Sequence, residues 1–195
     1  RNIKSIGNAM TKNTAECIVN AALLEFCENG YFATDTNKIA RRAGFAPQTF
    51  YRWFKDKTAV FLAAYKQWSD LEIQLLAVLP LNKEASEQVV DIVIMHHREY
   101  RMFRRSLRQL GVENLEVRQA RAENRLKQLS FFQQKLGLAD THRVTLLASM
   151  LQIERLADAL VEGEFDDLGV QEADIKSVMI NLISELFKHS FTALP

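Results

Sequence analysis

One short segment of the chain carries polar side chains of the kinds that bind nucleic-acid bases and phosphates. It is the predicted helix over residues 47–54, PQTFYRWF, whose outward positions are Pro47, Gln48, Thr49, Tyr51 and Arg52. Gln can pair with adenine through two hydrogen bonds, Thr can contact a thymine methyl group, and Tyr and Arg can hold phosphates. Lys57, at the start of the next predicted helix, is placed to reach the duplex backbone. The alternative interpretation is a small helix with ordinary surface residues.

The residues that must position this segment have the pattern of two short helices joined by a tight turn. Ala40 is small enough for a close helix crossing, and Gly44 allows the positive φ that the turn needs. Phe50 and Trp53, three residues apart, are expected to face back toward the protein. Two further apolar residues complete the expected small core: Ile39 and Phe45.

The charge of the chain is unevenly distributed. Residues 1–58 hold nine Lys and Arg against five Asp and Glu, a balance of +4, whereas the rest holds 16 against 19, a balance of −3. A basic head on a mildly acidic body suits a partner that offers phosphates at one end only.

The chain as a whole has the composition of an all-helical protein, with only 7 Gly and 3 Pro among 195 residues. Thr14 is a candidate cap for the first helix, and Thr34 or Asp35 for the second. Gly111, Gly137, Gly163 and Gly169 are expected to end the body helices. The predicted helices cover residues 14–29, 36–43, 47–54, 57 to the break at 80–82, 83–108, 113–136, 141–161 and 170–191. These elements predict a helix-turn-helix domain over residues 1–58 and a helical body over residues 59–195.

The stretch from about residue 14 to residue 65 resembles the DNA-binding domain of TetR-family regulators. The matching features are Glu28-Asn29-Gly30-Tyr31, Ile39-Ala40, Ala43-Gly44, and Thr49 to Phe54 followed by Lys55-Asp56-Lys57. Ala46 departs from the family, which often has a capping Ser or Thr there, and Pro47 beside it changes what faces the base edges. The operator sequence therefore does not transfer. The positions that match the family's DNA contacts are Thr36, Asn37, Gln48, Thr49, Tyr51 and Lys57.

The resemblance implies a ligand-responsive regulator, most often a repressor, that leaves a palindromic operator when a small-molecule effector binds. It also implies a homodimer joined by the last two helices of each chain. Helices 141–161 and 170–191 each show a broad apolar face, which fits a dimer, although packing within one chain is the alternative. The candidate effector-lining residues, each of which is also a candidate for plain core, are Trp68, Met95, His96, Tyr100, Phe103, Phe132 and Met150.

Other functional classes have less support. The chain has no GxSxG, HExxH, CxxC or Gly-rich phosphate motif, so no enzyme, metal or cofactor is predicted. His96 and His97 point about 100° apart on a helix and cannot chelate one metal together. Arg98, Arg101, Arg105 and Arg108 share one face of the predicted helix, either as a solvated surface or as an anion site. A cytoplasmic protein without a membrane segment is expected, and a helical adaptor protein with a homeodomain-like module is the alternative function.

Overall fold

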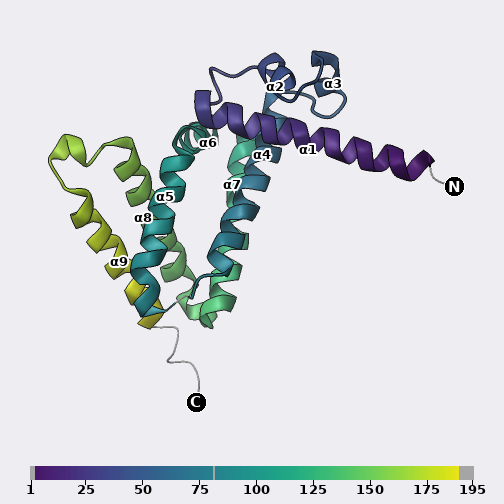
Figure 1. Cartoon of the computed structure of the whole chain (residues 1–195). Coiled ribbons are helices and arrows are strands. Elements are labelled where there is room, and N and C mark those ends of the chain that lie inside the picture. The colour runs from purple at the N-terminus through teal and green to yellow at the C-terminus, as the bar shows by residue number, and fades with distance from the viewer. Residues whose placement is uncertain (1–2, 81, 189–195) are drawn as a thin grey trace. The chain divides into compact units, whose positions relative to one another are not determined.

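The computed structural model describes residues 3–80 and 82–188, and in these ranges the chain is helical with no strand, which confirms the all-α prediction (Figure 1). The N-terminal helices are α1 (Ile3–Asn29), α2 (Thr36–Arg42), α3 (Pro47–Tyr51) and α4 (Lys57–Ala77). They are followed by α5 (Ser86–Glu99), α6 (Arg101–Glu113), α7 (Leu115–Leu136), α8 (Arg143–Glu162) and α9 (Glu172–Lys188). Short 3-10 turns at Lys83–Ala85, Asp140–His142 and Asp166–Leu168 precede α5, α8 and α9.

These helices form two compact units. The first contains the chain up to Leu71 together with Met102–Ala120, and the second contains Glu72–Arg101 and the chain from Arg121 onward. Helix α6 thus packs with the N-terminal helices, although it follows α5 of the second unit in sequence. The boundary between residues 58 and 59, which divides the predicted helix-turn-helix domain from the helical body, stays a prediction.

The first unit is built around the turn signals found in the sequence. Asp35 caps α2 by accepting a hydrogen bond from the Lys38 N–H at 2.8 Å. Gly30 and Gly44 have φ of +73° and +79°, which a residue with a Cβ adopts only with strain. Helix α1 already begins at Ile3, so the prediction that Thr14 caps it is wrong.

Aromatic rings form the core of the first unit. Phe61 contacts the rings of Phe26 and Phe103, at centroid distances of 5.1 and 5.0 Å. Ile18, Ala22 and Phe26 are fully buried along α1, as the spacing of four predicts. Ile39, Ala40 and Phe50 are buried as well, so α2 and α3 are fixed to this core by the expected side chains.

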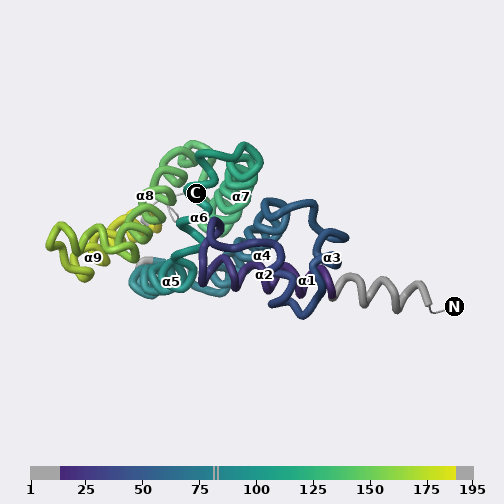
Figure 2. The backbone as a smooth tube through the Cα atoms, turned by 90° about the horizontal axis from the view of Figure 1, so that it is seen from above, coloured from purple at the N-terminus to yellow at the C-terminus, as the bar shows by residue number. Residues whose placement is uncertain are grey.

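The second unit packs α5, α8 and α9 as neighbours, an arrangement that Figures 1 and 2 show from two directions. Its apolar core includes Val90, Ile94, Leu146 and Met179, all nearly or fully buried. Gly163, with φ of +83°, ends α8 as predicted. Residues 189–191, the predicted end of the last helix, lie outside the described residues.

The predicted helix over residues 83–108 is in fact two helices. Tyr100, with φ of −100° and ψ of 20°, separates α5 from α6, and no Gly or Pro marks the break. The spacing that placed Arg98 and Arg108 on one face therefore no longer applies, because it assumed one continuous helix. Gly111 was expected to end a helix but lies buried within α6.

Two further expectations about single residues are wrong. Trp53 is 38% exposed, because α3 ends at Tyr51 and the helical spacing from Phe50 stops there. Met95 is 56% exposed, so α5 is not buried on all sides. Among the described residues, the helices lack the length and apolar character needed to cross a membrane.

Candidate nucleic-acid interface

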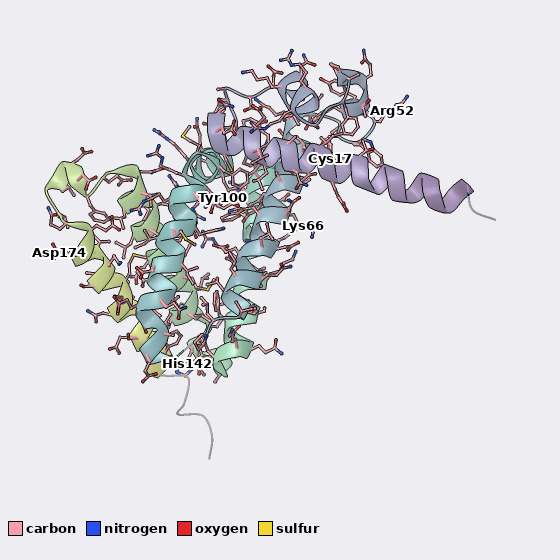
Figure 3. All side chains as sticks on the ribbon, in the orientation of Figure 1. Cys17, Arg52, Lys66, Tyr100, His142 and Asp174 are labelled. Atoms are coloured by element: carbon pink, nitrogen blue, oxygen red, sulfur yellow. The ribbon has the colours of Figure 1, made fainter. Side chains whose placement is uncertain are left out.

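Helix α3, which the sequence predicts to contact DNA bases and which we call the reading helix, presents its polar residues outward. Gln48, Tyr51 and Arg52 are exposed, while Pro47 and Thr49 are half-buried (Arg52 is labelled in Figure 3). Phe50 is fully buried and fixes the opposite side of α3. The helix therefore presents side chains with hydrogen-bonding groups on the face that its core contact leaves free.

Helices α2 and α3 are linked by a pair of hydroxyl groups that both belong to the predicted contacts. The Thr36 Oγ1 and the Tyr51 hydroxyl oxygen lie 2.9 Å apart. Whichever group donates, the O–H of the other remains available to donate to a phosphate oxygen. Asn37, next to Thr36 on α2, is exposed. The sequence predicted these residues singly, and the structure joins two of them across the turn.

Lys57 holds the loop between α1 and α2, a role that the sequence did not reveal. Its Nζ donates to the carbonyl oxygens of Tyr31 at 2.7 Å and Thr34 at 2.8 Å, and it lies 4.1 Å from the centroid of the Tyr31 ring. Burial disfavours the charged form and lowers the pKa of Lys57, an effect that nearby Asp35 partly offsets. An ammonium has three N–H bonds, so one donor beyond these two can still serve a phosphate.

Part of the positive charge counted in the head is paired inside the protein. Arg42 Nη1 donates to Glu25 at 3.1 Å and to Glu28 at 2.6 Å. Its hydrogen bonds to the Glu28 carboxylate raise the pKa of Arg42 and lower the pKa of Glu28. Lys55 lies 3.4 Å from Glu116. The count of charges along the sequence therefore overstates the positive charge available to a partner.

Helix α3 begins without a side-chain cap, as the alanine at position 46 predicts. Ala46 occupies the N-cap position with extended backbone angles and makes no side-chain cap hydrogen bond. The absent hydroxyl forgoes about 1 kcal/mol of helix stability. Pro47 at the first helical position compensates in part, because its fixed φ already suits a helix.

The seven predicted effector-lining residues divide between the two units. In the first unit, Trp68 and Phe103 are buried with ring centroids 5.8 Å apart, and the Arg104 guanidinium lies 5.4 Å from the centroid of the Trp68 ring. In the second unit, the rings of His96 and Tyr100 lie 4.8 Å apart. The remaining three are Phe132 and Met150, which pack against the apolar core of the second unit, and the exposed Met95.

A buried pair of a histidine and an aspartate in the second unit escaped the sequence analysis. His97 Nδ1 lies 2.9 Å from Asp158 Oδ1, and the two side chains are only 3% and 2% exposed. The pair joins α5 to α8. No local signal could have found it, because 61 residues separate its members.

Comparison with known proteins agrees with this geometry. The family model described as bacterial regulatory proteins of the tetR family matches residues 18–64, which contain α2, α3 and the turn between them. A fatty acid metabolism regulator protein of Bacillus subtilis (strain 168) is 29% identical over 110 residues. That match spans 56% of this chain and 56% of the relative, little more than half of either.

Two solved structures share the fold along most of the chain. Salmonella enterica GusR superposes with a TM-score of 0.67 at 16% identity, covering 90% of this chain and 96% of that one. The transcriptional regulator FadR from Bacillus subtilis, solved in complex with stearoyl-CoA, superposes with a TM-score of 0.59 at 21% identity. In that case 89% of this chain and 98% of the other are covered.

Helices α1–α3, with the polar side chains of α3 turned outward, define the helix-turn-helix class of domain, and a helical body follows it in the chain. Within that class, residues 18–64 are similar to the tetR family of bacterial regulatory proteins, whose family model they match.

Proposed function

We propose that the chain is a transcriptional regulator that represses from a palindromic operator and is released by a small-molecule effector. The observation that carries the proposal is the exposed polar face of α3, anchored from behind by buried Phe50, within the segment that matches the family model. The activity is binding rather than catalysis, and its place is the cytoplasm, where operator DNA lies. The proposed DNA contacts are those predicted from the sequence: Thr36, Asn37, Pro47, Gln48, Thr49, Tyr51, Arg52 and Lys57.

Two substitutions on the reading helix test this proposal by different signatures. Gln48→Ala is expected to weaken operator binding about 10-fold and to relax the preference for one base pair, because a base-edge contact is lost. Arg52→Ala is expected to weaken binding to all sequences alike. It should also reduce the slope of log K against log salt by about 0.9, because one phosphate contact is lost. Mobility-shift titrations on the DNA flanking the gene, at several salt concentrations, measure both effects.

The matched control is Lys127→Ala, which removes an exposed cation from α7 and should leave operator affinity and salt slope unchanged. Wild-type protein that binds no palindromic site at low salt would contradict the regulator proposal and favour the adaptor alternative. Arg52→Ala protein with an unchanged salt slope would remove Arg52 from the contacts.

A homodimer would present two reading helices to the two halves of a palindrome. We place the dimer contact on α8 and α9, which retain exposed apolar side chains. Val144, Ala148 and Leu151 lie on one face of α8, with Val144 76% and Leu151 43% exposed, and Val178 of α9 is 47% exposed. Isolated exposed apolar residues are common, but a row at helical spacing fits an isologous contact.

Leu151→Glu is expected to shift the dimer toward monomer by at least about 10-fold in dissociation constant, because it places two charges at the two-fold contact. Sedimentation velocity across a micromolar concentration series measures the shift. Val112→Glu, a change at an 83% exposed residue of α6, is the control and should leave the dimer intact. A wild-type chain that sediments as a monomer at these concentrations would contradict the dimer.

For the effector we propose a long-chain acyl thioester of coenzyme A. The support is the likeness to a fatty acid metabolism regulator and to a FadR structure that holds stearoyl-CoA. The body is also rich in partly buried apolar side chains, among them Phe132 and Met150, which suit an acyl chain.

The effector proposal predicts that stearoyl-CoA releases the protein from its operator and raises its melting temperature, because a ligand that binds only the folded state stabilises it. Free coenzyme A, which lacks the acyl chain, is the control and should do neither. Release by an unrelated small molecule with no response to acyl thioesters would overturn the effector class while leaving the regulator proposal in place.

A further inference from the structure

Tyr31, in the loop between α1 and α2, is held from two directions. Its backbone N–H donates to Ser106 Oγ of α6 at 2.9 Å, and its carbonyl accepts from Lys57 Nζ of α4 at 2.7 Å. Its hydroxyl lies 2.8 Å from Thr58 Oγ1, also on α4. One residue of the loop is thus tied to both α4 and α6, and all of these residues belong to the first compact unit.

The contact with Ser106 is closely fitted. Ser106 is only 5% exposed, and its hydroxyl donates to the Met102 carbonyl at 2.9 Å, which leaves a lone pair directed to accept the Tyr31 N–H. Gly30 precedes Tyr31 with φ of +73°, and a Cβ at that position would lie 3.3 Å from Ser106 Oγ. The loop approaches α6 this closely because residue 30 has no side chain.

From Tyr31 the contacts continue to α2 and α3. Lys57 Nζ also donates to the Thr34 carbonyl at 2.8 Å, and Thr34 directly precedes Asp35, the N-cap of α2. The first residue of α2 is Thr36, whose hydroxyl pairs with Tyr51 of α3. Ser106, Tyr31, Lys57 and the start of α2 therefore form one continuous set of contacts.

We propose that Ser106 is a positioning residue for DNA binding. It touches no DNA; it holds the Tyr31 peptide, and the Tyr31 carbonyl in turn holds Lys57 beside the start of α2. The proposal rests on the proposed regulator function, and it gives α6, a helix outside the helix-turn-helix, a direct part in the geometry of the reading face.

Ser106→Ala tests the proposal against Ser69→Ala. Ser69 is a matched control, because it is also buried in the first unit and its hydroxyl likewise bonds to a helix carbonyl, that of Lys66 at 3.1 Å. Ser106→Ala is expected to weaken operator binding about five-fold, the typical effect of one lost hydrogen bond. The slope of log K against log salt should stay unchanged, because no phosphate contact is lost. Ser69→Ala should bind as wild type does.

Amide hydrogen exchange provides a readout without DNA. In Ser106→Ala protein the Tyr31 N–H is expected to exchange about five-fold faster, whereas in Ser69→Ala protein its rate should not change. Wild-type affinity in Ser106→Ala protein, or an equal loss in both serine variants, would overturn the positioning role even though the wild type binds its operator. Absence of operator binding by the wild type would instead overturn the proposed function itself.

A double-mutant cycle with Lys57→Met tests whether the two residues act through the same peptide. Once Lys57→Met has released Tyr31 and Thr34, adding Ser106→Ala should cost less than about two-fold in affinity. The full five-fold loss in both backgrounds would show that Ser106 and Lys57 act independently and would overturn the proposed linkage.

Discussion

Replacing Phe50 with alanine is expected to lower the free energy of unfolding by about 3–5 kcal/mol and to abolish operator binding at concentrations where the wild type is saturated. Phe50 is fully buried and is the buried residue of α3, a helix of 5 residues. A helix of that length does not form by itself, because most helical stability in proteins comes from tertiary packing. Loss of this one ring therefore removes the packing that turns the polar face of α3 outward.

Chemical denaturation followed by circular dichroism measures the stability change, and mobility shift measures the binding change. Phe32→Ala is the matched control, since Phe32 is 56% exposed and its loss should change the unfolding free energy by less than about 0.5 kcal/mol. A loss below about 1 kcal/mol for Phe50→Ala would mean that the ring is not the anchor of α3.

Features of the head that depend on near neighbours in the sequence were predictable. The Asp35 cap, the positive φ of Gly44 and the place of Pro47 at the start of α3 each follow from one residue and the few around it. The prediction that Phe50 and Trp53 face the core was correct for Phe50 and wrong for Trp53, because helical spacing applies only as far as the helix extends.

Contacts between distant parts of the sequence were not predictable. The bonds from Arg42 to Glu25 and Glu28, and those from Lys57 to Tyr31 and Thr34, join residues 14 to 26 positions apart on different elements. Hydrophobic periodicity contains no information about such pairs. For the same reason, the sequence counted Arg42 as charge available for DNA, whereas the structure pairs it with acids.

The break at Tyr100 shows a different limit of prediction from the sequence. The apolar pattern runs through residues 89–107 without Gly or Pro, and the peptide nevertheless leaves the helix after Glu99. The helices on its two sides belong to different compact units, so tertiary packing decides where α5 ends. The break also places Arg98 on α5, whereas Arg101, Arg105 and Arg108 all lie on α6.

The second large effect is expected at Asp158. Asp158→Ala should lower the free energy of unfolding by about 1.5–3 kcal/mol, because it leaves the imidazole of His97 buried without the carboxylate that it contacts. The two side chains lie 2.9 Å apart at 3% and 2% exposure, where water cannot replace the lost partner. The pair connects α5 with α8, so we also expect the variant to lose the α8 face proposed for the dimer.

Denaturation at low and high salt separates this pair from ordinary surface charges. Arg98 and Glu172 form the comparison, since they join α5 to α9 at 3.1 Å with side chains 58% and 48% exposed. Glu172→Ala should cost less than about 1 kcal/mol, and salt should reduce that cost further, whereas the effect of Asp158→Ala should change little with salt. Combining Asp158→Ala with His97→Leu should recover part of the loss, because residue 97 then no longer buries a polar ring without its partner. If the double variant is less stable than Asp158→Ala alone, packing by the imidazole rather than its hydrogen bond to Asp158 holds α5 to α8.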